Sequence, residues 1–261
     1  WGQAIAYGNL GILYDAVGDW PRAVKYYEQA YALQEKIGDR QNQVTTVINL
    51  ATMHMQLGRH EAAWQDLATG LAIAQQLGDS WGTAVCQVNM AELALIQPDL
   101  ELAKGHAELA LALADEIGSS EIQVQARCCL ALALAGAELE TSSGLAGQAL
   151  ELAQEAKLQA EEANCYRTLG ILSGRTGKYD QAETYLGDAV ELSAKQNDPY
   201  RQGLALFELG CLYLALTQAG DSSDTNWPAQ AASTLNEAAE KFEALGAAYD
   251  LQATRQALSQ I

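Results

Sequence analysis

Three asparagines return at one interval in the chain. Asn9, Asn49 and Asn89 are separated by 40 residues each, and all three lie within stretches of helix-forming residues. Asparagine is a mediocre helix former, so its regular return needs a reason. An amide can donate to a peptide C=O and accept from a peptide N–H at once, which would grip a peptide backbone. The alternative is that each amide hydrogen-bonds only within its own framework of helices and turns.

Two arginines offer a different chemistry. Arg167 and Arg175 lie eight residues apart in an otherwise acidic sequence. Two guanidinium groups on one surface could clamp a carboxylate through paired hydrogen bonds. The same two groups could equally pair with glutamates of the chain itself. The sequence leaves both interpretations open.

The sequence lacks the residue patterns typical of catalytic, metal-binding and phosphate-binding sites. The three histidines, His54, His60 and His106, have no metal-ligand spacing, and His60-Glu61 lacks the second histidine of the H-E-x-x-H zinc motif. The stretch 174–179 lacks the first glycine of a phosphate-binding loop and is expected to follow a helix instead of a strand. We therefore predict no catalytic residue, no metal site, no cofactor and no enzymatic activity.

The charge and composition of the chain limit the classes of molecule that it is expected to bind. The chain has 33 acidic and 15 basic residues and a net charge of −18. Such a surface repels phosphate backbones and anionic lipids, so we expect no direct nucleic-acid binding and no membrane association. No apolar run approaches the length of a membrane span. The five cysteines are widely spaced and are expected to be small buried side chains in a reducing, cytoplasmic setting.

The elements that must position these residues form a repeat. Small residues close matching apolar blocks at intervals of 39 or 40, namely Gly11, Ala51, Ala91, Ala131, Gly170 and Gly210. A second marker, Gly38-Asp39, returns in phase as Gly78-Asp79 and Gly118-Ser119, with Asn197-Asp198 in the equivalent place later. Each unit is predicted to be two helices, with glycine ending one and aspartate capping the next. The small residues are expected to meet alanines of the second helix, such as Ala23 and Ala182, at a close crossing.

The predicted organisation is a single all-α domain over residues 1–261. Gly147 inside a helix and the polar stretch 217–228 are the expected irregularities, the latter an exposed loop. The expected units are residues 1–40, 41–80, 81–119, 120–158, 159–197 and 198–246, followed by a capping helix over 247–261.

The repeat resembles the tetratricopeptide repeat. The family pattern W-x2-L-G-x2-Y followed by A-x3-F is matched by Tyr7, Leu10, Gly11, Tyr14, Ala23 and Tyr27, and again by Tyr166, Leu169, Gly170, Ala182 and Leu186. The 40-residue period and the absent closing proline resemble the long repeats of the Pins/LGN adaptor and of bacterial MalT-like regulators. The resemblance implies a right-handed α-solenoid of six antiparallel helix pairs plus a cap.

The resemblance also implies a binding surface. In this family the first helix of each pair lines a concave groove, and in some members a ladder of asparagines there holds an extended peptide. The groove residues it implies here are Asn9, Asn49, Asn89, Thr52, Gln56, Glu92, Gln125, Asn164, Arg167 and Arg175. The implied function is a non-catalytic scaffold that binds a protein or peptide, with basic flanks favoured by the acidic surface.

Two further expectations remain open alternatives. The chain begins at Trp1 without methionine, which fits a sensor or regulatory arm of a larger signalling or transcription-regulating protein. We expect a monomer, with a weak dimer through the ends of the array as the alternative.

Overall fold

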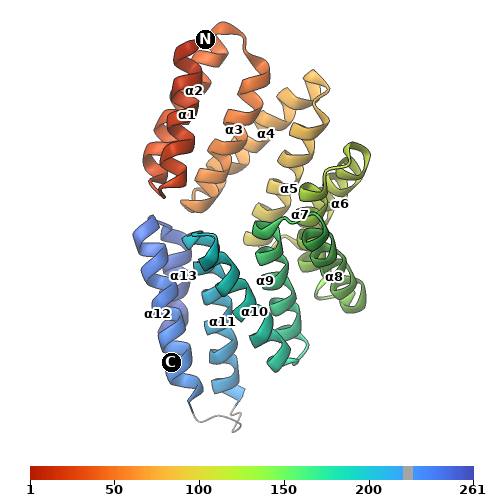
Figure 1. The fold of residues 1–261 in the computed structure, drawn as a ribbon, viewed down its shortest axis with the longest axis vertical. Coiled ribbons are helices and arrows are strands. Elements are labelled where there is room, and N and C mark those ends of the chain that lie inside the picture. The colour runs from red at the N-terminus through yellow and green to blue at the C-terminus, as the bar shows by residue number, and fades with distance from the viewer. Residues whose placement is uncertain (220–225) are drawn as a thin grey trace. The chain divides into compact units, whose positions relative to one another are not determined.

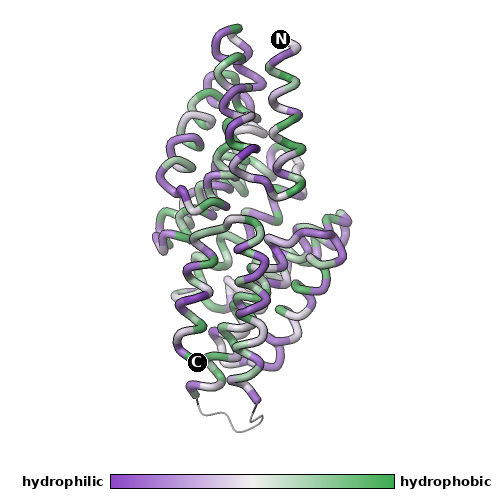
Figure 2. The backbone as a smooth tube through the Cα atoms, turned by 90° about the vertical axis from the view of Figure 1, so that its left-hand side faces the viewer, coloured by the Kyte–Doolittle hydropathy of each residue, from purple (hydrophilic) through white to green (hydrophobic). Residues whose placement is uncertain are grey.

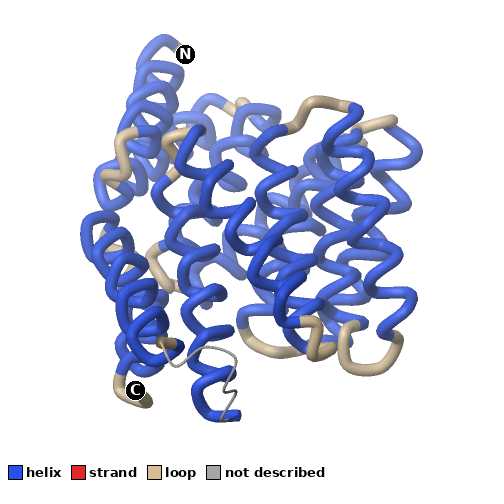
Figure 3. The backbone as a smooth tube through the Cα atoms, turned by 60° about the horizontal axis from the view of Figure 1, so that its bottom comes forward, coloured by secondary structure: helices blue, strands red, loops and turns tan. Residues whose placement is uncertain are grey.

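The computed structural model describes residues 1–219 and 226–261, and within them all regular structure is helical. Short loops join successive helices (Figure 3). The chain divides into two compact units, Trp1–Cys129 and Leu130–Ile261, and the boundary falls within helix α7. The predicted all-α fold is confirmed.

The first unit is built from consecutive helices that pack pairwise. Helix α1 packs on α2, α3 on α4 and α5 on α6, while α2 contacts α3 and α4 contacts α5. Figure 1 labels these helices along the chain. Their bounds are α1 Gly2–Ala16, α2 Trp20–Ile37, α3 Arg40–Gln56, α4 His60–Leu77, α5 Ser80–Ile96, α6 Leu100–Ile117 and α7 Ser120–Leu134.

The second unit continues the pattern. Each helix from α8 to α13 packs on the next, and α11 also contacts both α9 and α13. Their bounds are α8 Leu139–Glu155, α9 Gln159–Arg175, α10 Tyr179–Lys195, α11 Pro199–Ala219, α12 Trp227–Leu245 and α13 Ala248–Leu258. Residues 217–219, predicted as loop, extend α11, and residues 220–225 of that predicted loop lie outside the described part.

The helix ends follow from the turn residues. Gly38 ends α2 in the left-handed conformation, and Asp39 then accepts a hydrogen bond from the backbone N–H of Asn42, which caps α3. Asp79 repeats this arrangement at the start of α5 by accepting from Gly82. At the equivalent place in the second unit Lys157 has φ 58°, a conformation that favours glycine.

Small residues bring paired helices into close contact, but their partners differ from the prediction. A Cβ on Gly11 would lie 2.5 Å from Tyr27 Cε1, and one on Gly210 would lie 2.6 Å from Leu235 Cγ. The side chain opposite each glycine is therefore large, where the sequence predicted an alanine. Ala23 and Ala182 are fully buried elsewhere in the same interfaces. Hydrophobic and hydrophilic residues alternate along the helices, as a core between paired helices requires (Figure 2).

The cysteines were predicted to be small buried side chains, and this is confirmed for all but Cys211. Four are buried and Cys211 is half-buried. Burial raises the pKa of both Cys86 and Cys211 to about 12, so neither thiol is ionised near neutral pH.

Candidate functional site

The first helices of the pairs carry the predicted binding residues. We call α3, α5, α9 and α11 the A helices, together with α13, which contacts α11 as α11 contacts α9. In the first unit Asn49, Thr52 and Gln56 follow one another at helical spacing on α3, and Asn89 and Glu92 do so on α5. All five are half-buried. Because α3 and α5 contact each other, the structure places these polar residues on neighbouring helices.

The partners of these residues in the first unit are mixed. Asn49 hydrogen-bonds the phenol of Tyr27, and burial raises the pKa of that phenol despite this bond. Thr52 Oγ1 donates to the carbonyl of Ile48 at 3.1 Å. Gln56 Oε1 is enclosed and has no hydrogen-bond partner. Asn49 thus serves the helix framework, whereas the amide of Gln56 keeps an unused acceptor.

The other two predicted residues of this unit lie on other helices. Asn9 is exposed on α1, and Gln125 is half-buried on α7.

In the second unit the predicted arginine pairs with a glutamate of the chain. Arg167 on α9 donates to Asn164 Oδ1 at 3.3 Å, and its other terminal nitrogen lies 3.8 Å from Glu208 Oε1 on α11. The Arg167 and Glu208 side chains are 23% and 29% exposed, so the pair is only partly solvated. Arg175 is exposed at the end of α9. Arg167 therefore pairs with a glutamate of the chain itself, which is one of the two interpretations that the sequence left open.

A second carboxyl joins this cluster from α13. Tyr200 Oη donates to Asp250 Oδ2 at 3.3 Å. Burial raises the pKa of Asp250 to about 6, against the lowering effects of the Tyr200 hydrogen bond and of the Arg167 charge. Burial also raises the pKa of Glu208, although Arg167 and Arg175 oppose it. Arg167 therefore pairs with Glu208 and lowers the pKa of Asp250 through its charge.

We call Asn164, Arg167, Tyr200, Glu208 and Asp250 the α9–α11–α13 cluster. Sequence reasoning found Asn164 and Arg167 but missed the other three. Glu208 was visible as the residue at the asparagine-ladder position of the last repeat. Asp250 lies in a final helix that has no repeat markers, so only the packing of α13 on α11 reveals it. Together these groups can donate to and accept from the polar groups of a polypeptide.

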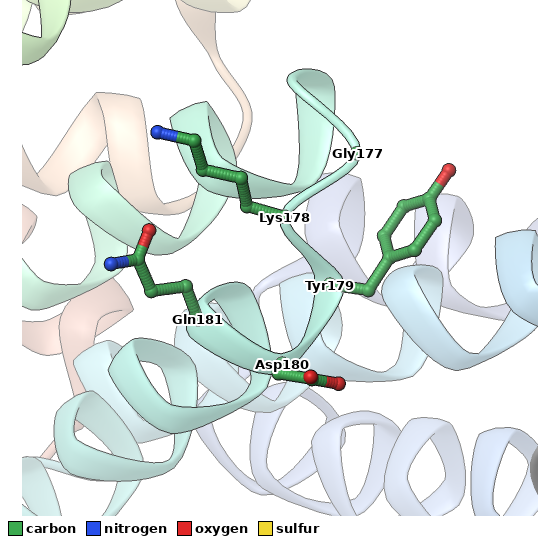
Figure 4. Close-up of a pocket in the computed structure, with 5 residues that line it drawn as sticks. All are labelled: Gly177, Lys178, Tyr179, Asp180 and Gln181. Atoms are coloured by element: carbon green, nitrogen blue, oxygen red, sulfur yellow. The ribbon is translucent and has the colours of Figure 1, made fainter.

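A shallow hollow lies beside the segment 174–179, whose sequence partly resembles a phosphate-binding loop. Figure 4 shows Gly177 to Gln181, with Lys178 and Gln181 on one side and Tyr179 on the other. Gly177 has φ 73°, and the segment is the turn between α9 and α10. The turn follows a helix, as predicted, so the strand that precedes a phosphate-binding loop is not present here.

Two of the three histidines make side-chain hydrogen bonds within the chain. His54 Nδ1 lies 2.7 Å from Asp66 Oδ2, and His106 Nδ1 lies 2.5 Å from Gln87 Oε1. Burial lowers the pKa of both His60 and His106. Within residues 1–219 and 226–261, no three His, Cys, Asp or Glu side chains are grouped so as to hold a metal ion. Nor does any helix in those ranges combine the length and apolarity needed to cross a membrane.

Two parts of the chain match the tetratricopeptide repeat family, residues 6–41 and residues 163–195. The fold is similar to the crystal structure of a Rap protein complexed with competence and sporulation factor, with TM-score 0.70, 16% identity, and coverage of 99% of this chain and 77% of that chain. The apo form of RapI gives TM-score 0.65 at 13% identity and 98% coverage of each chain.

A third similar structure is larger than this chain. It is a signal transduction ATPase with numerous domains and a tetratricopeptide repeat sensor, from Pyrococcus horikoshii, with TM-score 0.60 and 15% identity. The match covers 98% of this chain and 42% of that protein. The repeat matches and the helical architecture agree: residues 6–41 and 163–195 are tetratricopeptide repeats within an all-helical array.

Proposed function

We propose that the chain is a non-catalytic recognition module that binds a protein or peptide segment on the A helices of its units. The observation that carries the proposal is the α9–α11–α13 cluster, in which Arg167 pairs with Glu208 and acts through its charge on Asp250, both partly buried. Withdrawing charged groups from water costs stability, and an apolar replacement of similar shape often does better. Groups kept at such a cost on a surface of adjacent helices are suited to recognition.

The polar groups of the first unit form a second proposed recognition surface. Thr52, Gln56 and Glu92 lie half-buried on α3 and α5, and the carbonyl oxygen of the Gln56 amide is enclosed and has no hydrogen-bond partner. Asn89 is proposed to contribute its amide to this surface, whereas Asn49 hydrogen-bonds the phenol of Tyr27. These groups would hold a peptide backbone with little demand on its sequence.

The charge of the chain defines the kind of partner. With a net charge of −18, the surface favours a segment with basic flanks and weakens its association as salt rises. Glu208 and Asp250 add two carboxyls to the recognition surface against the single guanidinium of Arg167.

A sensor arm is the second candidate. Its support is the similarity to a Rap protein complexed with competence and sporulation factor, and to an ATPase whose tetratricopeptide repeats are described as a sensor. In that role the same surface binds an effector and passes the event to another domain.

A capture experiment tests the proposal. Immobilised wild type, Arg167→Ala and Arg255→Ala are incubated with lysate of the source organism, and the bound material is identified by mass spectrometry. Arg255 is the matched control because it is an exposed arginine of the same unit that pairs with Glu243 at 3.1 Å. We expect one partner to be retained by wild type and Arg255→Ala and lost by Arg167→Ala, with circular dichroism showing that all three are folded.

The captured molecule separates the two candidates. A scaffold retains a full-length protein, whereas a sensor arm retains a short peptide or a small molecule. Equal retention by all three baits would show that the α9–α11–α13 cluster is not the recognition surface.

A further inference from the structure

Helix α6 carries two exposed leucines on the side that faces away from its own helix pair. The residues that it buries toward α5 recur at helical spacing and are all alanines, namely Ala103, Ala107, Ala110 and Ala114. Leu102 and Leu109 are 38% and 54% exposed and lie on the other side of the helix, where Gly105 and Ala112 are also exposed. We call Leu102, Gly105, Leu109 and Ala112 the α6 seam.

The other helix pairs show that this outer side is ordinarily polar. Their second helices can be aligned with α6 on the small residues that each of them buries. At the position of Leu109 all five then carry a polar residue that is exposed or half-buried, namely Gln29, Thr69, Gln148, Asp188 and Glu237. The position of Leu102 also has no large apolar residue in any of the five. The leucines of the α6 seam are therefore a feature of this helix and not a requirement of the fold.

The α6 seam has the spacing of a helix-pairing surface. Its four residues follow one another at intervals of three, four and three positions, as apolar residues do along the contact line of a two-helix coiled coil. The space around Gly105 is open, because a Cβ there would meet nothing within 4 Å, so a helix laid on the seam can approach closely at this point. Such a helix would cover both leucines.

A row of carboxylates runs beside the α6 seam. Glu101, Glu108 and Asp115 recur every seven residues along one edge of it, and all three are exposed. Asp115 accepts a hydrogen bond from Gln123 at 2.7 Å. The half-buried Lys104 lies on the far side of the row from the seam. Charges at these flanking positions select the partner of a paired helix, so the row favours a helix with lysine or arginine opposite it.

The same charges argue against a second copy of this chain as the occupant. Each copy has a net charge of −18, so two copies repel each other. Two α6 seams paired antiparallel would also place the carboxylate rows of both copies against each other. An anionic membrane is disfavoured for the same electrostatic reason. A basic helix has the complementary charge.

We propose that the α6 seam is a docking surface for a basic amphipathic helix of a partner protein. That helix carries apolar side chains at the same three–four spacing, which cover Leu102 and Leu109, and lysine or arginine opposite the carboxylate row. Because the seam faces away from α5, this surface is separate from the surfaces proposed on the A helices. One helix pair buries less area than a standard interface, so the binding is reversible and weakens as salt rises.

Two synthetic helical peptides are the probes for this proposal. Each is about 28 residues long, with leucine and alanine at the three–four spacing and a fluorescent label. The Lys peptide has lysine at the flanking positions, and the Glu peptide has glutamate there. Binding to the chain is measured by fluorescence anisotropy at low salt, where charge pairing is strongest.

The first comparison tests the leucines. A double variant, Leu102→Thr with Leu109→Gln, installs the residues that α8 carries at the same positions, Thr141 and Gln148, so the fold tolerates them. Leu77→Gln is the matched control, at a leucine of α4 that is 42% exposed. We expect wild type and Leu77→Gln to bind the Lys peptide alike, and the double variant to bind it about tenfold more weakly or less. Equal binding by all three, or none by wild type, overturns the proposal.

Exchange of charge tests the carboxylate row. Glu101→Lys with Glu108→Lys is expected to lose the Lys peptide and to bind the Glu peptide instead. Glu28→Lys with Glu35→Lys is the control, because these exposed glutamates of α2 are also seven residues apart and their exchange alters the net charge equally. The control should keep the preference for the Lys peptide. If both double variants keep that preference, the carboxylate row does not select the partner and the proposal is wrong.

Sedimentation velocity of the chain without peptide tests the competing occupant. We expect the sedimentation coefficient of wild type to stay constant over about 1–100 µM. A dimer that forms in this range and is abolished by Leu102→Thr with Leu109→Gln would show that a second copy covers the α6 seam, against the proposal.

Discussion

Gly170 lies directly against Leu186. A Cβ on Gly170 would be 2.5 Å from Leu186 Cγ and 3.3 Å from the backbone nitrogen of Leu186, both closer than ordinary van der Waals contact. Gly210 has the same relation to Leu235 one repeat later. The missing side chain is what allows α9 and α10 to pack at this distance while a leucine fills the space between them.

The close approach of Gly170 to Leu186 predicts that a methyl group added at Gly170 changes the free energy of unfolding in a definite direction. Gly170→Ala should lower the free energy of unfolding by about 1–3 kcal/mol, because the methyl group overpacks the α9–α10 interface. Gly187→Ala is the matched control in α10, where a Cβ meets nothing within 4 Å. It should raise the free energy of unfolding by about 0.5–1 kcal/mol through helix propensity. Urea denaturation measures both, and equal effects would refute the packing argument.

The backbone of Lys157 gives a second stability prediction. Lys157 has φ 58°, and Leu158 N–H bonds the carbonyl of Ala153 at 2.8 Å, just as Asp39 N–H bonds Gln34 at 2.9 Å after Gly38. A lysine in this left-handed conformation costs roughly 1–2 kcal/mol relative to a right-handed one. Lys157→Gly should therefore raise the free energy of unfolding by about 0.5–1 kcal/mol, after the entropy of glycine is subtracted. Lys157→Ala, which keeps the Cβ, should give no such gain in the same urea titration.

The sequence was sufficient for the helices because their signals are local. Gly38 and Asp39 mark one helix end and the next helix start, and the repeat of that pair marks the others. Lys157 is an exception to these local signals. Its backbone is left-handed, but a lysine in the sequence does not predict a left-handed turn. A backbone hydrogen bond from Leu158 N–H to the carbonyl of Ala153 closes this turn as the equivalent bond closes the glycine turns.

The candidate site was predicted only in part, and for a physical reason. Arg167 stands out in an acidic sequence, and its pairing with a glutamate was one of two stated alternatives. Asp250 is 83 residues away from Arg167 in the sequence, and its raised pKa depends on the packing of α13 against α11. A repeat pattern gives no information on a helix outside the repeat. The interaction became visible only with the fold.

Removing Arg167 should reveal the free-energy cost of burying the carboxyls of Glu208 and Asp250. Arg167→Met leaves Glu208 and Asp250 without their guanidinium, so the free energy of unfolding should fall by about 1–3 kcal/mol at pH 8. The loss should shrink at pH 5, where the carboxyls take up protons more readily. Adding Glu208→Gln to Arg167→Met should restore part of the loss, as a double-mutant cycle in urea would measure. A loss that is the same at both pH values, with no coupling to Glu208, would assign Arg167 a packing role only.

Asp250 should make the native state less stable as pH rises. Its pKa of about 6 lies above its ordinary value of 3.8, so the folded chain holds this proton more tightly than the unfolded chain. The cost is absent below the lower value, grows between the two, and is complete above about pH 6. Asp250→Asn keeps an oxygen that can accept from Tyr200 but has no charge to bury. It should raise the free energy of unfolding by about 2 kcal/mol at pH 7.5 and by almost nothing at pH 4.

Asp188→Asn is the control for this titration because Asp188 is an exposed carboxylate of the same unit. Its free energy of unfolding should stay within about 0.5 kcal/mol of wild type at both pH values. If Asp250→Asn is also less able to retain the partner captured by wild type, the carboxylate is kept for recognition at the expense of stability. If Asp250→Asn raises the free energy of unfolding equally at pH 4 and pH 7.5, the amide simply packs better. Burial of the Asp250 charge would then not be what destabilises the wild-type fold.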